Sequence, residues 1–220
     1  MSKQDYIYQQ EPRKELLDLI PLENRNGDVL EIGAGAGDTL LYAKEKEFAK
    51  NIYGVELCNI ENSNQTNSIF SNFIIGNIET LELPFDKNSF DVIICGDVLE
   101  HLVDPYKVLK VLKTYLKEDG VMVASIPNIR EFKTMKKIFF DGDFKYEDSG
   151  ILDRTHLRFF TKKNIIDLFK NEGFDILKVV SSNKGLAMRY LKRLRIFKLF
   201  LQIFFEELVT VRYFIVAKNK

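Results

Sequence analysis

Short apolar runs alternate along the chain with stretches in which apolar residues recur every three or four positions. The runs lack a regular alternation of polar and apolar residues, which indicates strands buried on both faces, as in a parallel sheet. We predict strands at residues 28–32, 51–56, 72–75, 90–95, 120–125, 174–181 and 209–217. The helical patterns between them predict an α/β fold with helices on both faces of one doubly wound sheet.

Helix signals of differing strength lie between these runs. Asp104 followed by Pro105, and Thr161 further along, are residue types that favour a helix start. The helix expected at 59–67 has the weakest basis, because that segment is polar and rich in asparagine. The predicted helices cover residues 11–20, 39–50, 59–67, 106–116 and 161–173.

The 220 residues contain no repeat, low-complexity tract or linker, so we predict one domain over residues 1–220. The alternation of strands and helices breaks after Pro127. Residues 128–160 are aromatic, charged and irregular, and we interpret them as an insertion that covers an acceptor pocket. A second insertion, at about 186–208, has the pattern of an amphipathic helix. Three roles for this helix stay open: covering the sheet, contacting a second copy in a homodimer, or attaching peripherally to anionic lipid.

Charge and cysteine content narrow the range of partners. Lysine plus arginine and aspartate plus glutamate number 32 each, so the formal net charge is zero. Without an overall positive field, we expect a small-molecule acceptor and no nucleic acid. Cys58 and Cys95 are far apart and lack the spacing of metal ligands. Because neither a signal-peptide pattern nor an apolar segment of membrane-spanning length occurs, we expect a cytoplasmic protein.

A glycine-rich turn follows the first predicted strand. Its sequence is Glu31-Ile32-Gly33-Ala34-Gly35-Ala36-Gly37. Glycines at such a strand end let the backbone turn tightly and approach a ligand. Glu56 ends the second strand, where a carboxylate can accept hydrogen bonds from ribose hydroxyls. The spacing differs from the G-x-G-x-x-G of dinucleotide sites, and Glu31 suits a cation better than a pyrophosphate, which disfavours an NAD-dependent oxidoreductase.

Five segments in order resemble motifs of the class I S-adenosylmethionine-dependent methyltransferases. They are VLEIGAGAG, YGVEL, GNIE, FDVIICGDVLEHLVDP and LKEDGVMVASIPN. The resemblance implies a Rossmann-like sheet of seven strands, mostly parallel with the last antiparallel, and S-adenosylmethionine as cofactor. Asn77 departs from the family's usual aspartate at the position that contacts adenine, although an amide oxygen can also accept a hydrogen bond. The expected cofactor-binding residues are Glu31, Gly33, Ala34, Gly35, Gly37, Glu56, Leu57, Asn77, Ile78 and Asp97.

The chain has two histidines, and both are candidate catalytic residues. His101 follows the fourth strand, where ligands bind in open α/β sheets. Methyl transfer to a hydroxyl benefits from a base, and histidine is well matched to accept a proton near neutral pH. We expect His101 to be the general base, with His156 second. Asp97, Glu100 and His101 with a distant histidine also resemble the metal-binding set of small-RNA 2′-O-methyltransferases, so a divalent metal ion is an alternative.

The segment FDGDFKYEDSGILDRTHLRFFT resembles a subgroup of bacterial methyltransferases associated with capsule and other surface-polysaccharide biosynthesis. The resemblance implies a sugar, nucleotide-linked sugar or capsule precursor as acceptor, methylated on a hydroxyl or phosphate-type oxygen. We expect Tyr146, Asp153, Arg154 and Arg158 to bind the acceptor, because arginine suits phosphate or carboxylate and aromatic rings stack on sugars or bases. A quinone or phenol acceptor and a noncatalytic cofactor-binding partner subunit are the alternatives.

Overall fold

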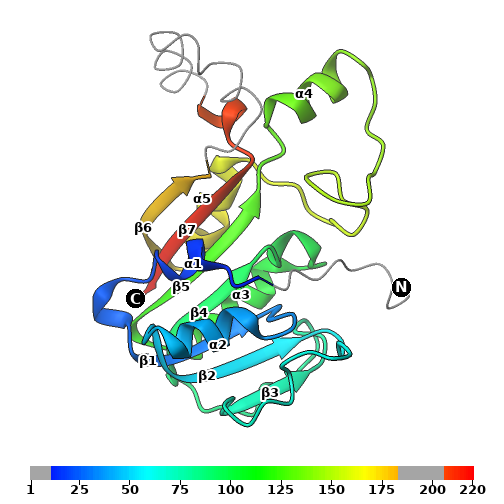
Figure 1. Ribbon diagram of the computed structural model, residues 1–220. Helices are drawn as coiled ribbons and strands as arrows, with labels where there is room; N and C mark the ends of the chain where they lie inside the picture. The colour runs from blue at the N-terminus through cyan, green and yellow to red at the C-terminus, as the bar shows by residue number, and fades with distance from the viewer. Residues whose placement is uncertain (1–10, 183–205) are drawn as a thin grey trace.

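The computed structural model describes residues 11–182 and 206–220 (Figure 1). Seven strands form a sheet in the order β3-β2-β1-β4-β5-β7-β6. β7 pairs antiparallel with both β5 and β6, whereas the other neighbouring strands are parallel. This confirms the predicted sheet with its antiparallel last strand. The strands are β1 Gly27–Ile32, β2 Ala49–Glu56, β3 Asn72–Ile75, β4 Phe90–Gly96, β5 Leu116–Pro127, β6 Phe174–Ser181 and β7 Arg212–Asn219.

Helices cover both faces of this sheet. The α-helices are α1 Lys14–Leu17, α2 Asp38–Glu45, α3 Pro105–Lys113, α4 Phe132–Phe139 and α5 Lys162–Asn171, and the 3-10 turns are η1 Leu22–Asn24 and η2 Leu99–His101. Two of the predicted helix starts are confirmed. The Asp104 carboxylate accepts a hydrogen bond from the Lys107 N–H at 3.0 Å, and Pro105 occupies the first turn of α3. The Thr161 hydroxyl accepts from the Asn164 N–H at the start of α5.

Successive side chains of the central strands enter two different apolar layers. Leu30 and Ile32 of β1 pack in the layer that contains the buried faces of α3 and α5. Val29 packs on the opposite face with residues of α1 and α2. Because both faces are covered by helices, the strands contain apolar residues at nearly every position, which is the pattern seen in the sequence.

The structure corrects several predicted boundaries. The helix expected to reach residue 50 ends at Glu45, because Glu47 adopts a left-handed φ of 58° and the chain enters β2 at Ala49. No helix forms at 59–67, where the Asn67 carboxamide accepts the Ile69 N–H and stabilises a local turn instead. The helix expected at 11–20 shortens to α1, followed by turns that still bury the predicted apolar stripe.

Two strand starts and one helix also differ from the prediction. β5 begins at Leu116, before the predicted 120, because a register irregularity against β4 accommodates the extra residues. β7 begins at Arg212 and not at 209. Residues 128–160, expected to be irregular, contain α4, whose N-terminus is capped by the Glu131 carboxylate accepting the Thr134 N–H at 2.9 Å. Figure 1 shows α4 and the segment after it as an excursion beyond the end of β5.

Most of the amphipathic helix predicted at 186–208 lies outside the described residues, so its three possible roles stay predictions. Within residues 11–182 and 206–220, no helix has the length and apolar character needed to cross a membrane.

Candidate active site

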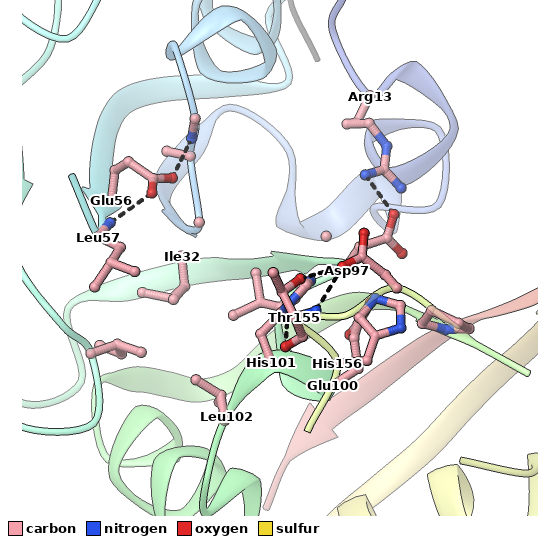
Figure 2. Close-up of a pocket in the computed structure, with 18 of the residues that line it drawn as sticks. Arg13, Ile32, Glu56, Leu57, Asp97, Glu100, His101, Leu102, Thr155 and His156 are labelled. Carbon is pink, nitrogen blue, oxygen red and sulfur yellow. Dashed lines mark hydrogen bonds and ion pairs between the residues drawn. The ribbon is translucent and has the colours of Figure 1, made fainter. Parts of the chain in front are cut away.

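A cavity of about 600 Å³ opens at the carboxyl ends of β1, β2 and β4. Figure 2 shows side chains from these strands and from the segment before α5 facing it. The predicted site residues that line the cavity are Glu31, Gly33, Ala34, Gly35, Glu56, Leu57, Asn77, Ile78, Asp97, His101, Asp153 and His156. Gly37, Tyr146, Arg154 and Arg158 are not among its lining residues. The cavity therefore unites the expected cofactor residues with both histidines.

The glycine turn between β1 and α2 forms one wall. Gly33 has a φ of +68°, and a Cβ added there would lie 2.5 Å from a methyl carbon of Val98. Gly37 has a φ of +90°, and its added Cβ would lie 2.7 Å from the Phe70 ring. Both positions therefore need glycine for backbone conformation and space. Gly37 is not among the residues that line the cavity.

Glu56 is fixed at the end of β2 by backbone donors. Its carboxylate accepts hydrogen bonds from the Gly35 N–H at 2.8 Å and from the Leu57 N–H at 2.7 Å (Figure 2). The side chain is buried and lines the cavity. A carboxylate has about four acceptor positions, and ribose hydroxyls are donors that suit them. This arrangement fits a ribose.

Glu31 is a buried carboxyl group on the same wall. Burial is the main cause that raises its pKa to about 8, and the positive charge of Arg13 opposes that rise. Its Oε2 atom has no hydrogen-bond partner within the described part of the chain. A buried carboxylate is stable only when it is paired. A ligand with a cationic group fits this position because it would pair with the ionised carboxylate, whereas a pyrophosphate would repel that form.

Asp97 lies at the end of β4 with a left-handed φ of 56°. Its carboxylate forms ion pairs with Arg13 at 3.1 Å and with Arg212 at 3.2 Å, and it accepts the Ser125 hydroxyl at 2.7 Å. Arg13 also donates to Ser125 at 3.0 Å. Sequence reasoning missed Arg13, Ser125 and Arg212, because they approach Asp97 from distant segments and no local motif marks them.

The two histidine rings lie side by side, with ring centroids 4.7 Å apart. His101 Nδ1 lies 3.1 Å from the Thr155 carbonyl oxygen, and His156 Nδ1 lies 2.9 Å from the Ile151 carbonyl oxygen. Burial, followed by the nearby His156, lowers the pKa of His101. His101 is therefore a neutral imidazole near pH 7.

Glu100 lies beside the two histidines, with a carboxylate oxygen within 4.8 Å of a ring nitrogen of each. It is 1% exposed, and burial raises its pKa well above the ordinary value. Within residues 11–182 and 206–220, neither carboxylate oxygen has a hydrogen-bond partner. The Glu100 main-chain oxygen accepts the N–H groups of Leu157 and Arg158 at 2.8 and 2.9 Å. These bonds hold the segment that carries His156 against η2.

The predicted acceptor residues do not converge. Tyr146 packs near Phe144 and Phe159, with ring centroids 6.0 and 6.3 Å away. Arg154 forms an ion pair with Asp148, and Arg158 donates to main-chain oxygens of Leu157 and Val103.

Asp153 alone of the four predicted acceptor residues reaches the cavity, and its carboxylate also accepts the Thr155 N–H at 2.8 Å. Residues 148–151, which sequence reasoning did not single out, also line the cavity. Asn77 lines it as well, while its amide oxygen accepts the Glu79 N–H at 2.9 Å.

Comparisons with known proteins agree with this geometry. Residues 5–179 match the family model described as "Methyltransferase domain". Demethylmenaquinone methyltransferase of Staphylococcus aureus is 25% identical over 177 residues, covering 74% of this chain and 73% of that protein. A SAM-dependent methyltransferase from Archaeoglobus fulgidus superposes with a TM-score of 0.63 at 20% identity, covering 93% of this chain and 91% of that one.

The same fold also occurs in an enzyme that catalyses a different reaction. The [4+2]-cyclase SpnF superposes with a TM-score of 0.64 at 14% identity, covering 96% of this chain and 85% of that one. Structural likeness at such identity shows the fold alone. The match to the family model indicates methyltransferase activity. The chain belongs to the methyltransferase domain family, and it is a methyltransferase whose cofactor is S-adenosylmethionine.

Proposed function

We propose that the chain methylates a hydroxyl oxygen of a small, polar acceptor. S-adenosylmethionine supplies a methyl group on a sulfonium centre, which an oxygen nucleophile attacks once it has lost its proton. The observation that carries the proposal is the His101 imidazole, whose Nδ1 lies 3.1 Å from the Thr155 carbonyl oxygen, on the wall of the cavity that also contains Glu31 and Glu56. Nitrogen and sulfur nucleophiles have less need of such a base.

His101 is suited to take the proton. When its Nδ1–H donates to the Thr155 carbonyl, the lone pair of the ring lies on Nε2. A lowered pKa keeps this atom unprotonated at neutral pH, so it can accept the hydroxyl proton. His156, whose Nδ1 is held by the Ile151 carbonyl, is the second candidate.

The polar side chains on the histidine side of the cavity support a sugar or a nucleotide-linked sugar as acceptor. Asp148, Ser149, Asp153 and Thr155 line the side that carries the histidines. Hydroxyl-rich ligands can form further hydrogen bonds to such groups, whereas the apolar tail of a quinone would exclude water from them and offer no hydrogen bond in return. The same segment carries the sequence resemblance to methyltransferases of surface-polysaccharide biosynthesis. The demethylmenaquinone relative makes a quinone or phenol the second candidate acceptor.

The test combines an acceptor panel with one substitution. Nucleotide-linked sugars and a phenolic quinone precursor are each incubated with the protein and labelled cofactor, and label in the sugar fraction supports the proposal. His101→Ala is expected to lower turnover about a hundredfold while cofactor affinity stays within about twofold. Lys110→Ala, on the exposed face of α3, is the matched control. Label only in the phenol would overturn the sugar acceptor, and undiminished turnover of the variant would overturn the role of His101.

A further inference from the structure

Three potential metal ligands meet at one point on the cavity wall. Glu100, His101 and His156 each offer one ligand atom, and these atoms lie within 4.8 Å of one another (Figure 2). All three residues line the cavity. We propose that they bind one divalent metal ion. The chemistry that we assign to the ion rests on the proposed function, but its binding does not.

Both imidazoles are oriented as metal ligands are. Each Nδ1 is within hydrogen-bond distance of a main-chain carbonyl, Thr155 for His101 and Ile151 for His156. A carbonyl can only accept, so Nδ1 carries the hydrogen in each ring and the lone pair lies on Nε2. Metal-binding histidines commonly donate their other N–H to a carbonyl or carboxylate, which fixes the tautomer and the ring orientation. The fold therefore prepares two Nε2 ligands from separate segments.

Glu100 supplies the charge that an ion requires. Its side chain is 1% exposed, and neither carboxylate oxygen has a hydrogen-bond partner in the described part of the chain. The nearest arginines, Arg13 and Arg212, are already paired with Asp97. A buried carboxylate without a partner is unfavourable, and a bound cation would supply the missing interaction.

The ligand types indicate the class of ion. Two imidazoles and one carboxylate form a set that first-row ions such as Mn²⁺, Fe²⁺ and Zn²⁺ occupy with open coordination positions. Ca²⁺ prefers oxygen ligands alone and is expected to bind poorly. The open positions would face the cavity, where an acceptor hydroxyl could coordinate the ion and become more acidic. In the ion-loaded protein the coordinated hydroxyl would lose its proton to solvent water, and this route would replace direct proton removal by His101.

The experiment measures ion binding without any acceptor. Full-length protein, stripped with a chelator and dialysed, is titrated with Mn²⁺ while the electron paramagnetic resonance signal of the free ion is followed. We expect about one ion per chain with a dissociation constant below about 1 mM. Zn²⁺ should displace the bound Mn²⁺, and Ca²⁺ should not.

Variants connect the binding to this cluster. Glu100→Gln and His156→Gln are each expected to weaken Mn²⁺ binding at least tenfold, whereas Glu79→Gln, which removes another carboxylate of the cavity, should leave it unchanged. Retained binding of S-adenosylhomocysteine by at least one cluster variant shows that the fold is intact. Absence of saturable Mn²⁺ and Zn²⁺ binding, or equal binding by wild type and both cluster variants, would overturn the site.

The two proposals fail in different ways. Protein that methylates a sugar hydroxyl but binds no ion, and whose turnover is unaffected by chelator, refutes the metal site and leaves the proposed function intact. Protein that binds one ion through the cluster but methylates only a phenol refutes the sugar acceptor and leaves the metal site intact.

Discussion

Glu31 is a buried acid whose charge state should depend on the cofactor. Arg13 favours its ionised form, whereas burial and the carboxylates of Glu56 and Asp38 oppose ionisation, and the resulting pKa is about 8. The cationic part of S-adenosylmethionine would stabilise the ionised form, so binding at pH 7 should release a proton from Glu31. Cofactor affinity should accordingly rise with pH up to about 8. Calorimetry in two buffers with different ionisation enthalpies measures the released proton.

The Glu31→Gln variant provides the control for this linkage. It should bind the cofactor more weakly, release no proton and lose the rise in affinity between pH 6 and 8. For the cofactor-free protein we expect the opposite pH dependence, in the free energy of unfolding. Its folded state holds the proton up to about pH 8, while the unfolded chain loses it near 4.5, so the stability from this group falls as pH rises through that window. Equal proton release by variant and wild type would assign the linkage to another group.

Glu56→Ala should lower cofactor affinity by tenfold or more. The substitution removes the carboxylate that is expected to accept the ribose hydroxyls, at about 1.5–3 kcal/mol for each charged hydrogen bond. It also leaves the N–H groups of Gly35 and Leu57 without their acceptor. Calorimetric titration with S-adenosylhomocysteine measures the effect, and Glu45→Ala, at the exposed end of α2, is the control. An unchanged affinity for Glu56→Ala would contradict the assigned role.

At this scale local spacing in the sequence was enough to predict which residues after β1 and β2 line the cavity. The glycine turn and Glu56 follow strand ends, and the topology of the fold brings strand ends together. Arg13 and Arg212 could not be predicted, because they reach Asp97 through contacts between distant parts of the chain. Arg154 and Arg158 were chosen by residue type alone, and neither lines the cavity, because Arg154 pairs with Asp148 and Arg158 donates to a main-chain oxygen.

Among the elements, strands were predicted more reliably than the segments between them. Short apolar runs located β3 and β6 at their observed bounds, although both are edge strands that are only partly buried. The failure at 59–67 has a local cause, since asparagine and serine side chains bond to nearby backbone groups and compete with a helix. The α4 helix was missed although Phe132, Met135 and Phe139 recur within it at helical spacing.

The start of α5 offers a test of a predicted cap. Thr161→Ala should lower the free energy of unfolding by about 1 kcal/mol, because the Asn164 N–H loses the hydroxyl that accepts it. Thr161→Ser keeps the acceptor and should stay within about 0.5 kcal/mol of wild type. Urea denaturation followed by circular dichroism measures both variants. Similar losses for alanine and serine would show that the threonine methyl group, and not the cap, provides the stability.

On the scale of the whole molecule, the family resemblance was needed to predict the direction of β7. β7 is the last strand in the chain, yet it lies between β5 and β6 and runs antiparallel to both. Apolar patterning predicts that a strand exists but does not encode its neighbours or direction. The cavity depends on this topology, because Arg212 reaches Asp97 from the start of β7.

Ligand binding to this cavity should stabilise the entire fold. Its walls come from β1, β2 and β4, from Arg13 before α1 and from the segment that carries His156, so a ligand there contacts parts that must separate on unfolding. At a concentration one hundred times its dissociation constant, S-adenosylhomocysteine should add about 2.7 kcal/mol to the stability of the folded state. For a chain of 220 residues this corresponds to a rise in Tm of roughly 5–10 °C.

Differential scanning calorimetry should show that rise with S-adenosylhomocysteine and none with NAD at the same concentration, because Glu31 disfavours a pyrophosphate. Glu56→Ala should reduce the rise at a fixed ligand concentration, which connects it to this cavity. An equal rise with NAD would mean that the glycine turn accepts a dinucleotide and that Glu31 does not disfavour a pyrophosphate.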